Sequence, residues 1–278
     1  MTQHATIAAI RRHLDEVRRG GKSIGLVPTM GALHAGHGAL IDRARRESDH
    51  VVVSIFVNPI QFDRQADYEA YKVNLAADLQ FCEVRGTDAV FVPGVEEMYP
   101  QPAATFVEVT GVSDQLCGKF RPGHFRGVAT VVTKLLNIIA PDKAYFGEKD
   151  AQQLAVIQRM VEDLNVAVEI VPVPTVRESD GLALSSRNQR LTADERRVAP
   201  VLYRALQAGQ SAAQNGAGAN EIREAALAVL REQPSIRLEY LEVVELSGVR
   251  RIAAAIWLGS TRLIDNVSVT ARTLQSAS

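Results

Sequence analysis

Cysteine and aromatic residues are scarce in this 278-residue sequence, which contains two cysteines, one tryptophan and 5% aromatic residues. Cys82 and Cys117 are too far apart for a CxxC pair and too few for a disulfide framework, so neither a redox motif nor a disulfide scaffold is expected. Such sparing use of cysteine fits a protein of the reducing cytoplasm.

An excess of charge and a long apolar run are also missing. The 31 Lys and Arg residues nearly balance the 32 Asp and Glu residues, which gives no reason to expect nucleic acid or a membrane surface as a partner. No apolar run approaches the roughly 20 residues that span a bilayer, and residues 1–20 contain no signal-peptide core. These absences predict a soluble, cytoplasmic globular protein.

Two common phosphate-binding patterns, GxxxxGK[ST] and GxGxxG, do not occur. The sequence instead has His34 and His37 three residues apart with Gly36 between them, in the segment Pro28–His37 that follows the apolar run Ile24–Val27. The amino end of a helix attracts phosphate, and paired imidazoles can donate hydrogen bonds to a phosphoryl group whose charge changes during reaction. This spacing predicts phosphate chemistry at a helix start. The alternative is that both histidines are merely satisfied in a loop.

Apolar runs alternate with helical patterns through the first two thirds of the chain. Because the runs are apolar at consecutive positions, they predict parallel strands covered on both faces, in a doubly wound α/β sheet with ligands at the carboxyl ends of the strands. The predicted strands are 24–27, 51–56, 89–92, 144–146 and 167–172, and the predicted helices are 38–47, 68–84, 127–139 and 151–164. The segments after three of these strands, 29–37, 58–62 and 147–153, should therefore converge.

The pattern changes after Pro174. A capping box at Thr192–Glu195 predicts a helix that reaches about Ala213, and a second helix follows over 221–232. Alternating runs at 238–245, 254–258 and 261–264 predict a small antiparallel sheet. We therefore expect a Rossmann-like domain over 1–174 and a smaller α+β domain over 175–278.

Polar residues at the predicted junctions suggest further ligand contacts. Lys149 could neutralise phosphate oxygens, and Ser185-Ser186-Arg187 could clamp a triphosphate. Gln61 can donate and accept, which suits a substrate with hydroxyl and carboxylate groups. Asp150 could contact ribose or a metal, or it could merely cap a helix. For Asn58, one alternative is that it does no more than shape the turn before Pro59.

Six stretches in order along the chain resemble the pantothenate synthetase (pantoate–β-alanine ligase) family of HIGH-motif nucleotidyltransferases. They are 28–37, 54–62, 121–135, 145–157, 180–188 and 261–266. The resemblance implies ATP-dependent joining of pantoate to β-alanine through a pantoyl adenylate, with Mg²⁺, in a homodimer whose smaller domain acts as a lid. The departures from the family pattern are Lys72-Val73 for Pro-Arg, Cys117 for Glu and Leu184 for Met.

The resemblance also implies roles for individual residues. His37 acts as a proton donor, Gln61 and Gln153 hold pantoate, and Gln61 also lies close to β-alanine. Together with the charge argument, it makes His37, His34 and Lys149 the candidate catalytic residues, while the metal ligands stay unknown. The implied ATP-binding residues are Met30, Gly31, Ala32, Leu33, His34, Ala35, Gly36, His37, Gly147, Glu148, Lys149, Asp150, Val176, Leu184, Ser185, Ser186 and Arg187.

Two other functions are compatible with a histidine-marked phosphate site. One is a nucleotidyltransferase that stops at a nucleotide-linked product, and the other is a nucleotide-binding regulatory protein without turnover. The paired glutamines disfavour the first, and the presence of His34, His37, Lys149 and Arg187 disfavours the second.

Overall fold

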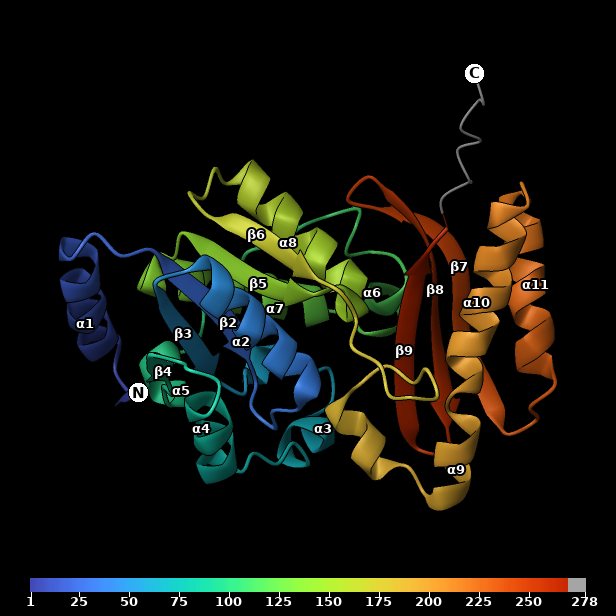
Figure 1. Cartoon of the computed structure of the whole chain (residues 1–278), viewed down its shortest axis with the longest axis horizontal. Coiled ribbons are helices and arrows are strands. Elements are labelled where there is room, and N and C mark those ends of the chain that lie inside the picture. The colour runs from blue at the N-terminus through green and yellow to red at the C-terminus, as the bar shows by residue number, and fades with distance from the viewer. Residues whose placement is uncertain (270–278) are drawn as a thin grey trace. The chain divides into compact units, whose positions relative to one another are not determined.

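A computed structural model describes residues 1–269 of the chain. The chain divides into two compact units. Unit 1 comprises Met1–Glu148 and Gln152–Pro174, and unit 2 comprises Lys149–Ala151 and Thr175–Ser278, of which residues 270–278 lie outside the described part. Each unit has its own sheet (Figure 1) and its own hydrophobic core.

Unit 1 is built on a six-stranded parallel sheet, which confirms the predicted doubly wound α/β architecture. Its strand order is β1-β4-β3-β2-β5-β6, where β1 is Thr2–His4, β2 Ile24–Thr29, β3 His50–Ile55, β4 Ala89–Phe91, β5 Lys143–Gly147 and β6 Glu169–Val173. The short strand β1 was not predicted from the sequence, because its three residues are polar and mostly exposed. It pairs with β4 at the edge of the sheet.

Helices cover both faces of this sheet, as Figure 1 shows. Ile41 of α2 and Cys82 of α4 share a buried cluster with Val51 and Val53 of β3. Because strand side chains alternate between faces, the other side chains of β3 point to the opposite face, where α7 lies. The helices are α1 (Ile7–Arg19), α2 (Ala35–Glu47), α3 (Gln65–Glu69), α4 (Leu75–Glu83), α5 (Val95–Met98), α6 (Cys117–Phe120), α7 (His124–Ile139) and α8 (Ala151–Asp163), with single 3₁₀ turns η1 (Pro59–Gln61) and η2 (Glu148–Asp150).

The helix predicted over 68–84 is wrong as one element. The structure has α3 ending at Glu69 and α4 beginning at Leu75. The Asn74 side chain accepts a hydrogen bond from Ala77 N at 3.2 Å, so Asn74 caps α4 instead of continuing a helix. The break leaves residues 70–74 to lie against the segment that follows β2, since Tyr71 Oη donates to Gly31 O at 3.5 Å.

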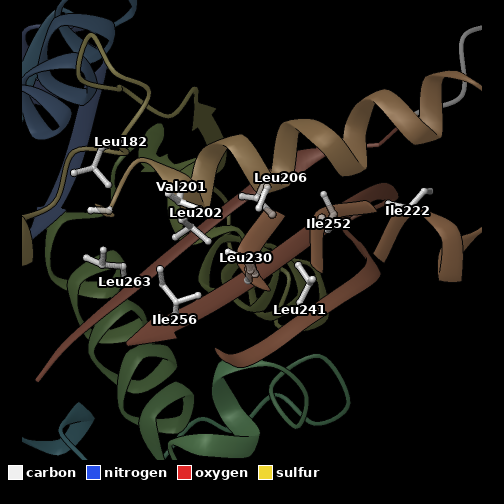
Figure 2. Close-up of a cluster of buried hydrophobic side chains, with 14 of the residues drawn as sticks. Leu182, Val201, Leu202, Leu206, Ile222, Leu230, Leu241, Ile252, Ile256 and Leu263 are labelled. Carbon is white, nitrogen blue, oxygen red and sulfur yellow. The ribbon is translucent and has the colours of Figure 1, made fainter. Parts of the chain in front are cut away.

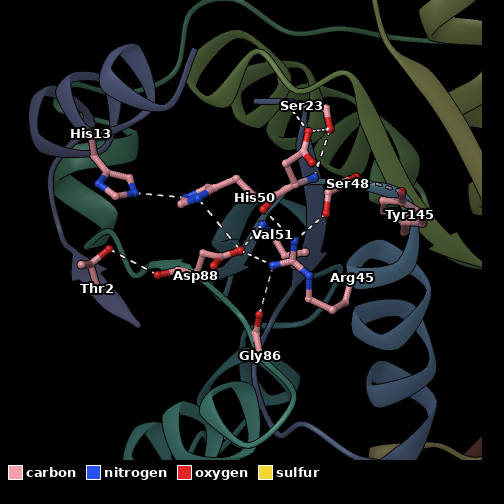
Figure 3. A network of polar contacts seen from close by, with 11 residues as sticks. Thr2, His13, Ser23, Arg45, Ser48, His50, Val51, Gly86, Asp88 and Tyr145 are labelled. Carbon is pink, nitrogen blue, oxygen red and sulfur yellow. Dashed lines mark hydrogen bonds and ion pairs between the residues drawn. The ribbon is translucent and has the colours of Figure 1, made fainter. Parts of the chain in front are cut away.

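A polar network ties the amino ends of the strands together (Figure 3). The Asp88 carboxylate accepts from Val51 N at 2.7 Å and pairs with the Arg45 guanidinium. His50, at the start of β3, lies with its Nδ1 3.9 Å from the same carboxylate, and its Nε2 lies 3.1 Å from Nε2 of His13 on α1. This network fixes α1 and α2 to the end of the sheet that is opposite the predicted ligand edge.

Unit 2 contains the predicted small antiparallel sheet, with strands β7 (Ile236–Leu246), β8 (Val249–Leu258) and β9 (Thr261–Ser268). Helices α10 (Val201–Gln214) and α11 (Ala219–Arg231) pack on it through a buried aliphatic cluster that includes Leu206, Ile222 and Ile252 (Figure 2). The predicted helix from Thr192 to Ala213 is broken into α9 (Ala193–Val198) and α10. Pro200 lies at the break, where proline cannot donate a helical hydrogen bond.

Candidate active site

The chain order of the parallel strands reverses between β2 and β5. From β2 the sheet continues through β3 and β4 in one direction, and on the other side of β2 lie β5 and β6. Ligands of open α/β sheets bind outside the carboxyl ends of the strands at such a reversal. The segments that leave this edge directly beside it are Met30–His37 after β2 and Gly147–Glu148 after β5.

Both histidines lie at the start of α2, which begins at Ala35, three residues before its predicted start. His34 is the N-cap residue, and its Nδ1 accepts from Gly36 N at 3.1 Å. Nδ1 of His37 accepts from His34 N at 3.3 Å, and the two ring centroids are 4.2 Å apart. Because each Nδ1 is an acceptor, each neutral imidazole carries its proton on Nε2. The capping contacts therefore set the tautomer in which Nε2–H is the donor of each ring.

The loop 30–34, between β2 and α2, has an unusual backbone. Gly31 has a φ of 79° and Ala32 a φ of 51°. Ala32 N and Leu33 N donate to the two carboxylate oxygens of Asp78, at 2.9 and 2.8 Å. Asp78, on α4, is only 3% exposed. Sequence reasoning missed this residue because it lies inside a stretch predicted as uninterrupted helix, with no motif of its own.

Gln61 is brought directly to this loop. Its Nε2 lies 2.8 Å from Met30 Sδ, and its Oε1 accepts from Asn58 Nδ2 at 3.1 Å. Asn58 Nδ2 also donates to Gly127 O at 3.1 Å, while Asn58 Oδ1 accepts from Tyr99 Oη at 2.9 Å. The side chain of Asn58 makes no capping bond in η1. The Asn58 side chain therefore holds the Gln61 side chain in place, so Asn58 does more than shape the turn before Pro59.

The segment Arg121–Gly127 lies beside Gln61 as well. His124 Nδ1 is 2.8 Å from Gln61 O, and the Arg121 guanidinium pairs with Asp63 at 3.0 Å. The partner Arg121 holds the pKa of the Asp63 carboxyl below its usual value, although partial burial opposes the shift. Basic and amide groups from three segments that are far apart in sequence thus gather in unit 1.

The two glutamines of α8 differ in their surroundings. Gln152 is buried and donates to Val112 O and Gln115 O at 2.9 and 2.6 Å, while its Oε1 accepts from Cys117 N at 3.0 Å. Gln153, the candidate pantoate contact, is half-buried in the first turn of α8. Gln152 is therefore the structural member of the pair, and it fixes the backbone at Cys117.

Unit 2 groups another part of the candidate ATP site. A small pocket is lined by Lys149, Ser185 and Arg187, together with Asn188, Arg262 and Asp265. Val176 and Leu184 do not line this pocket but pair with each other next to Ala183, which does, since Leu184 N donates to Val176 O at 2.9 Å. Ser186 begins the 3₁₀ turn η3 (Ser186–Arg190), and Ser185 Oγ caps this turn by accepting from Arg187 N at 3.2 Å. The predicted cationic and hydroxyl residues are therefore neighbours.

Buried polar contacts support this pocket from β9. Asp265 forms a bidentate ion pair with Arg177, with hydrogen bonds of 2.6 and 3.0 Å. Burial raises the pKa of the Asp265 carboxyl, and Arg177 opposes this shift. The next residue, Asn266, donates from Nδ2 to Lys149 O at 3.0 Å. Lys149 Nζ lies 3.8 Å from the carboxylate of Asp150. These contacts fix the main chain at Lys149.

Residues 1–269 contain no group of three or more His, Cys, Asp and Glu side chains placed to hold a metal ion. No helix within the same range is both long and apolar enough to cross a membrane.

Known proteins resemble the chain along nearly its whole length. A family model described as pantoate-beta-alanine ligase matches residues 2–268. The pantothenate synthetases of Moorella thermoacetica and Thermotoga neapolitana are each 50% identical to the chain, over 94% of it and over 96% and 97% of their own lengths.

Solved structures agree with these sequence matches. A pantothenate synthetase from Thermus thermophilus superimposes with a TM-score of 0.92 at 46% identity, covering 97% of this chain and 100% of that one. A pantoate-beta-alanine ligase from Francisella tularensis, described as complexed with beta-gamma ATP and beta-alanine, has a TM-score of 0.84 at 36% identity over 96% of this chain and 97% of its own. The chain therefore belongs to the pantoate–β-alanine ligase family.

Proposed function

We propose that this protein is a ligase that condenses pantoate with β-alanine at the expense of ATP, giving pantothenate, AMP and pyrophosphate. The observation that supports this proposal most directly is the match of the family model over residues 2–268. The chain is also 50% identical in sequence to a pantothenate synthetase. The relative from Francisella tularensis, described as a complex with beta-gamma ATP and beta-alanine, supports both small molecules as substrates. The histidine pair at a helix start agrees with chemistry at a phosphate.

The reaction needs two steps because a carboxylate is a poor acyl donor. In the first step a carboxylate oxygen of pantoate bonds to the α-phosphorus of ATP, and the bond from that phosphorus to the pyrophosphate oxygen breaks. In the second step the amine nitrogen of β-alanine bonds to the activated carbonyl carbon, AMP leaves with the bridging oxygen, and the nitrogen loses a proton. Charge grows on the α-phosphate in the first step, so fixed hydrogen-bond donors there lower the barrier.

We assign the donors of the first step to His34, His37 and Lys149. The Nε2–H tautomer of the two imidazoles, set by their capping contacts, suits this role. Gln61 and Gln153 would hold pantoate, and Gln61 would also meet β-alanine. The remaining proposed ATP contacts are Met30, Gly31, Ala32, Leu33, Ala35, Gly36, Gly147, Glu148, Asp150, Val176, Leu184, Ser185, Ser186 and Arg187.

Magnesium is proposed to enter as part of the substrate. Residues 1–269 offer no ready cage of ligating side chains, and Mg²⁺ usually binds through one or two carboxylates together with substrate phosphates. MgATP is therefore the expected form of the nucleotide. A homodimer, a cytoplasmic location, nucleotide and pantoate binding by residues 1–174 and a lid role for residues 175–278 stay predictions from the family resemblance.

The release of AMP tests this function against its nearest competitor. The purified protein is given ATP, magnesium and pantoate, with or without β-alanine, and AMP, pyrophosphate and pantothenate are measured. We expect continuous AMP release only when β-alanine is present. A nucleotidyltransferase that stops at a nucleotide-linked product would turn over many times without β-alanine and release no AMP, and this result would refute the ligase assignment.

A further inference from the structure

The loop 30–34 is held by a carboxylate that lies outside every motif described above. Asp78 accepts hydrogen bonds from two consecutive backbone N–H groups of this loop, those of Ala32 and Leu33. We propose that Asp78 is a positioning residue for ATP, because it fixes the loop that carries His34 to the start of α2. This inference rests on the proposed function, since it assumes that the loop binds the nucleotide.

The backbone of the loop explains why it needs a clamp. Ala32 has a φ of 51°, in the left-handed region that non-glycine residues adopt at a cost. Such a conformation persists only where surrounding contacts fix it. The Asp78 carboxylate does so by accepting from the N–H groups on both sides of the Ala32 Cα, with one oxygen for each N–H. A return of Ala32 to a right-handed backbone would turn at least one N–H away from the carboxylate.

The contacts of Asp78 are not needed by its own helix. Asn74 already caps α4 through Ala77 N, and the Asp78 backbone is bonded to Asn74 O. A buried carboxylate is unfavourable unless hydrogen bonds satisfy it, and the bonds that satisfy Asp78 come from the loop. Its side chain is therefore accounted for by the loop and not by the stability of α4.

The loop is also packed tightly from the same side. A Cβ atom on Gly31 would lie 2.7 Å from Val73 Cγ1 and 2.9 Å from Asp78 Oδ2. The Val73 side chain borders Gly31. Contacts with residues 71–78 therefore fix the backbone of the loop. Because His34 follows Leu33 directly, these contacts also fix the position of His34.

The test compares Asp78→Asn with a matched control. Asparagine has nearly the same size, but it offers an amide NH₂ to one of the two backbone N–H groups, so that hydrogen bond is lost. Cys82→Ala is the control, because Cys82 lies one turn further along α4 and is fully buried, but none of the hydrogen bonds described for residues 1–269 joins its side chain to the loop. For each protein we would measure Tm, the dissociation constant of ATP, and the KM values of ATP and pantoate in pantoate-dependent ATP–pyrophosphate exchange.

We expect Asp78→Asn to weaken ATP binding by about tenfold or more and to lower kcat/KM for ATP by at least as much, while the KM of pantoate changes by less than about twofold. Cys82→Ala should lower Tm and leave the ATP constants unchanged. Equal ATP constants in Asp78→Asn and the control would overturn the proposal. Tighter ATP binding by Asp78→Asn would also overturn it, because the carboxylate would then act through charge repulsion.

A second variant approaches the same clamp from the loop. Gly31→Ala adds a methyl group that meets Val73 and Asp78, at a backbone φ of 79°, and should produce the same selective loss of ATP affinity. If Asp78→Asn does not fold, Gly31→Ala serves as the test variant. Unchanged ATP affinity in Gly31→Ala would then refute the proposed role of Asp78 in fixing the loop. If the wild-type protein binds ATP but shows no pantoate-dependent exchange, the proposed function fails, and the direct ATP constants still decide the role of Asp78.

Discussion

Replacing Asn58 by alanine should affect both stability and pantoate binding, because this side chain connects the core to Gln61. Asn58 is 1% exposed, and its three hydrogen bonds reach Gln61 Oε1, Gly127 O and Tyr99 Oη. The alanine variant leaves the Gly127 carbonyl and the Tyr99 hydroxyl without this partner and removes the anchor of Gln61.

The size of the effect follows from the groups left unsatisfied. Each polar group that loses its partner costs about 1–3 kcal/mol, so the loss of stability should be about 2–6 kcal/mol for the carbonyl and the hydroxyl together. A Gln61 side chain that is no longer held should weaken pantoate by about 1–2 kcal/mol, which is roughly tenfold in KM. The affinity for ATP should change little.

Tyr99→Phe is the matched control. It removes one hydrogen bond of Asn58 but keeps the bond between Asn58 and Gln61. We expect a stability loss of about 1 kcal/mol with an unchanged KM for pantoate, whereas Gln61→Ala should raise that KM with little loss of stability. Urea denaturation and initial-rate kinetics measure both quantities. The reasoning is refuted if Asn58→Ala keeps the wild-type KM for pantoate, or if Tyr99→Phe raises it as much.

Four further results are expected. His37→Ala should slow pantoate-dependent ATP–pyrophosphate exchange by about 10²–10³-fold, and a near wild-type exchange rate would contradict its role. Arg187→Ala should slow adenylation more than the reaction of preformed pantoyl adenylate with β-alanine, because pyrophosphate has already left; equal defects in a quenched-flow experiment would reject the phosphate clamp. Burial holds the pKa values of His4 and His50 below their usual value of 6.5, so the unfolded chain binds more protons and stability should fall as the pH falls below that value; urea titrations should show a flatter pH dependence for His50→Asn. Burial raises the pKa of the Cys82 thiol to about 11, so Cys82→Ala should not change the rate at which the folded protein reacts with a thiol reagent near neutral pH.

The central strands could be predicted because burial on both faces leaves a direct record in the sequence. Val51 to Ile55 are apolar at almost every position and are buried in the structure. Strand β1 left no such record, because its residues are polar and its pairing with β4 depends on the tertiary structure. The predicted helices over 68–84 and 192–213 failed for a local reason, since Asn74 and Pro200 interrupt a helical apolar pattern that otherwise continues.

The candidate site shows the same division. The histidine pair could be identified from the sequence, because two histidines at this spacing directly after an apolar run indicate phosphate chemistry at a helix start. Asp78 and Asn58 were not identified as supports, because a hydrogen bond to a distant backbone group leaves no spacing in the sequence. The resemblance to a family supplied roles for single residues, but it could not supply the contacts that hold Gln61 against Met30.

The fate of the pantoate carboxylate oxygens tests the central claim most directly. Pantoate labelled with heavy oxygen at both carboxylate positions is converted with ATP, magnesium and β-alanine, and the masses of the products are measured by mass spectrometry. Attack of the carboxylate on the α-phosphate predicts one labelled oxygen in AMP, one in the amide carbonyl of pantothenate and none in pyrophosphate. Label in inorganic phosphate, with ADP as the nucleotide product, would show attack at the γ-phosphate and would contradict the account.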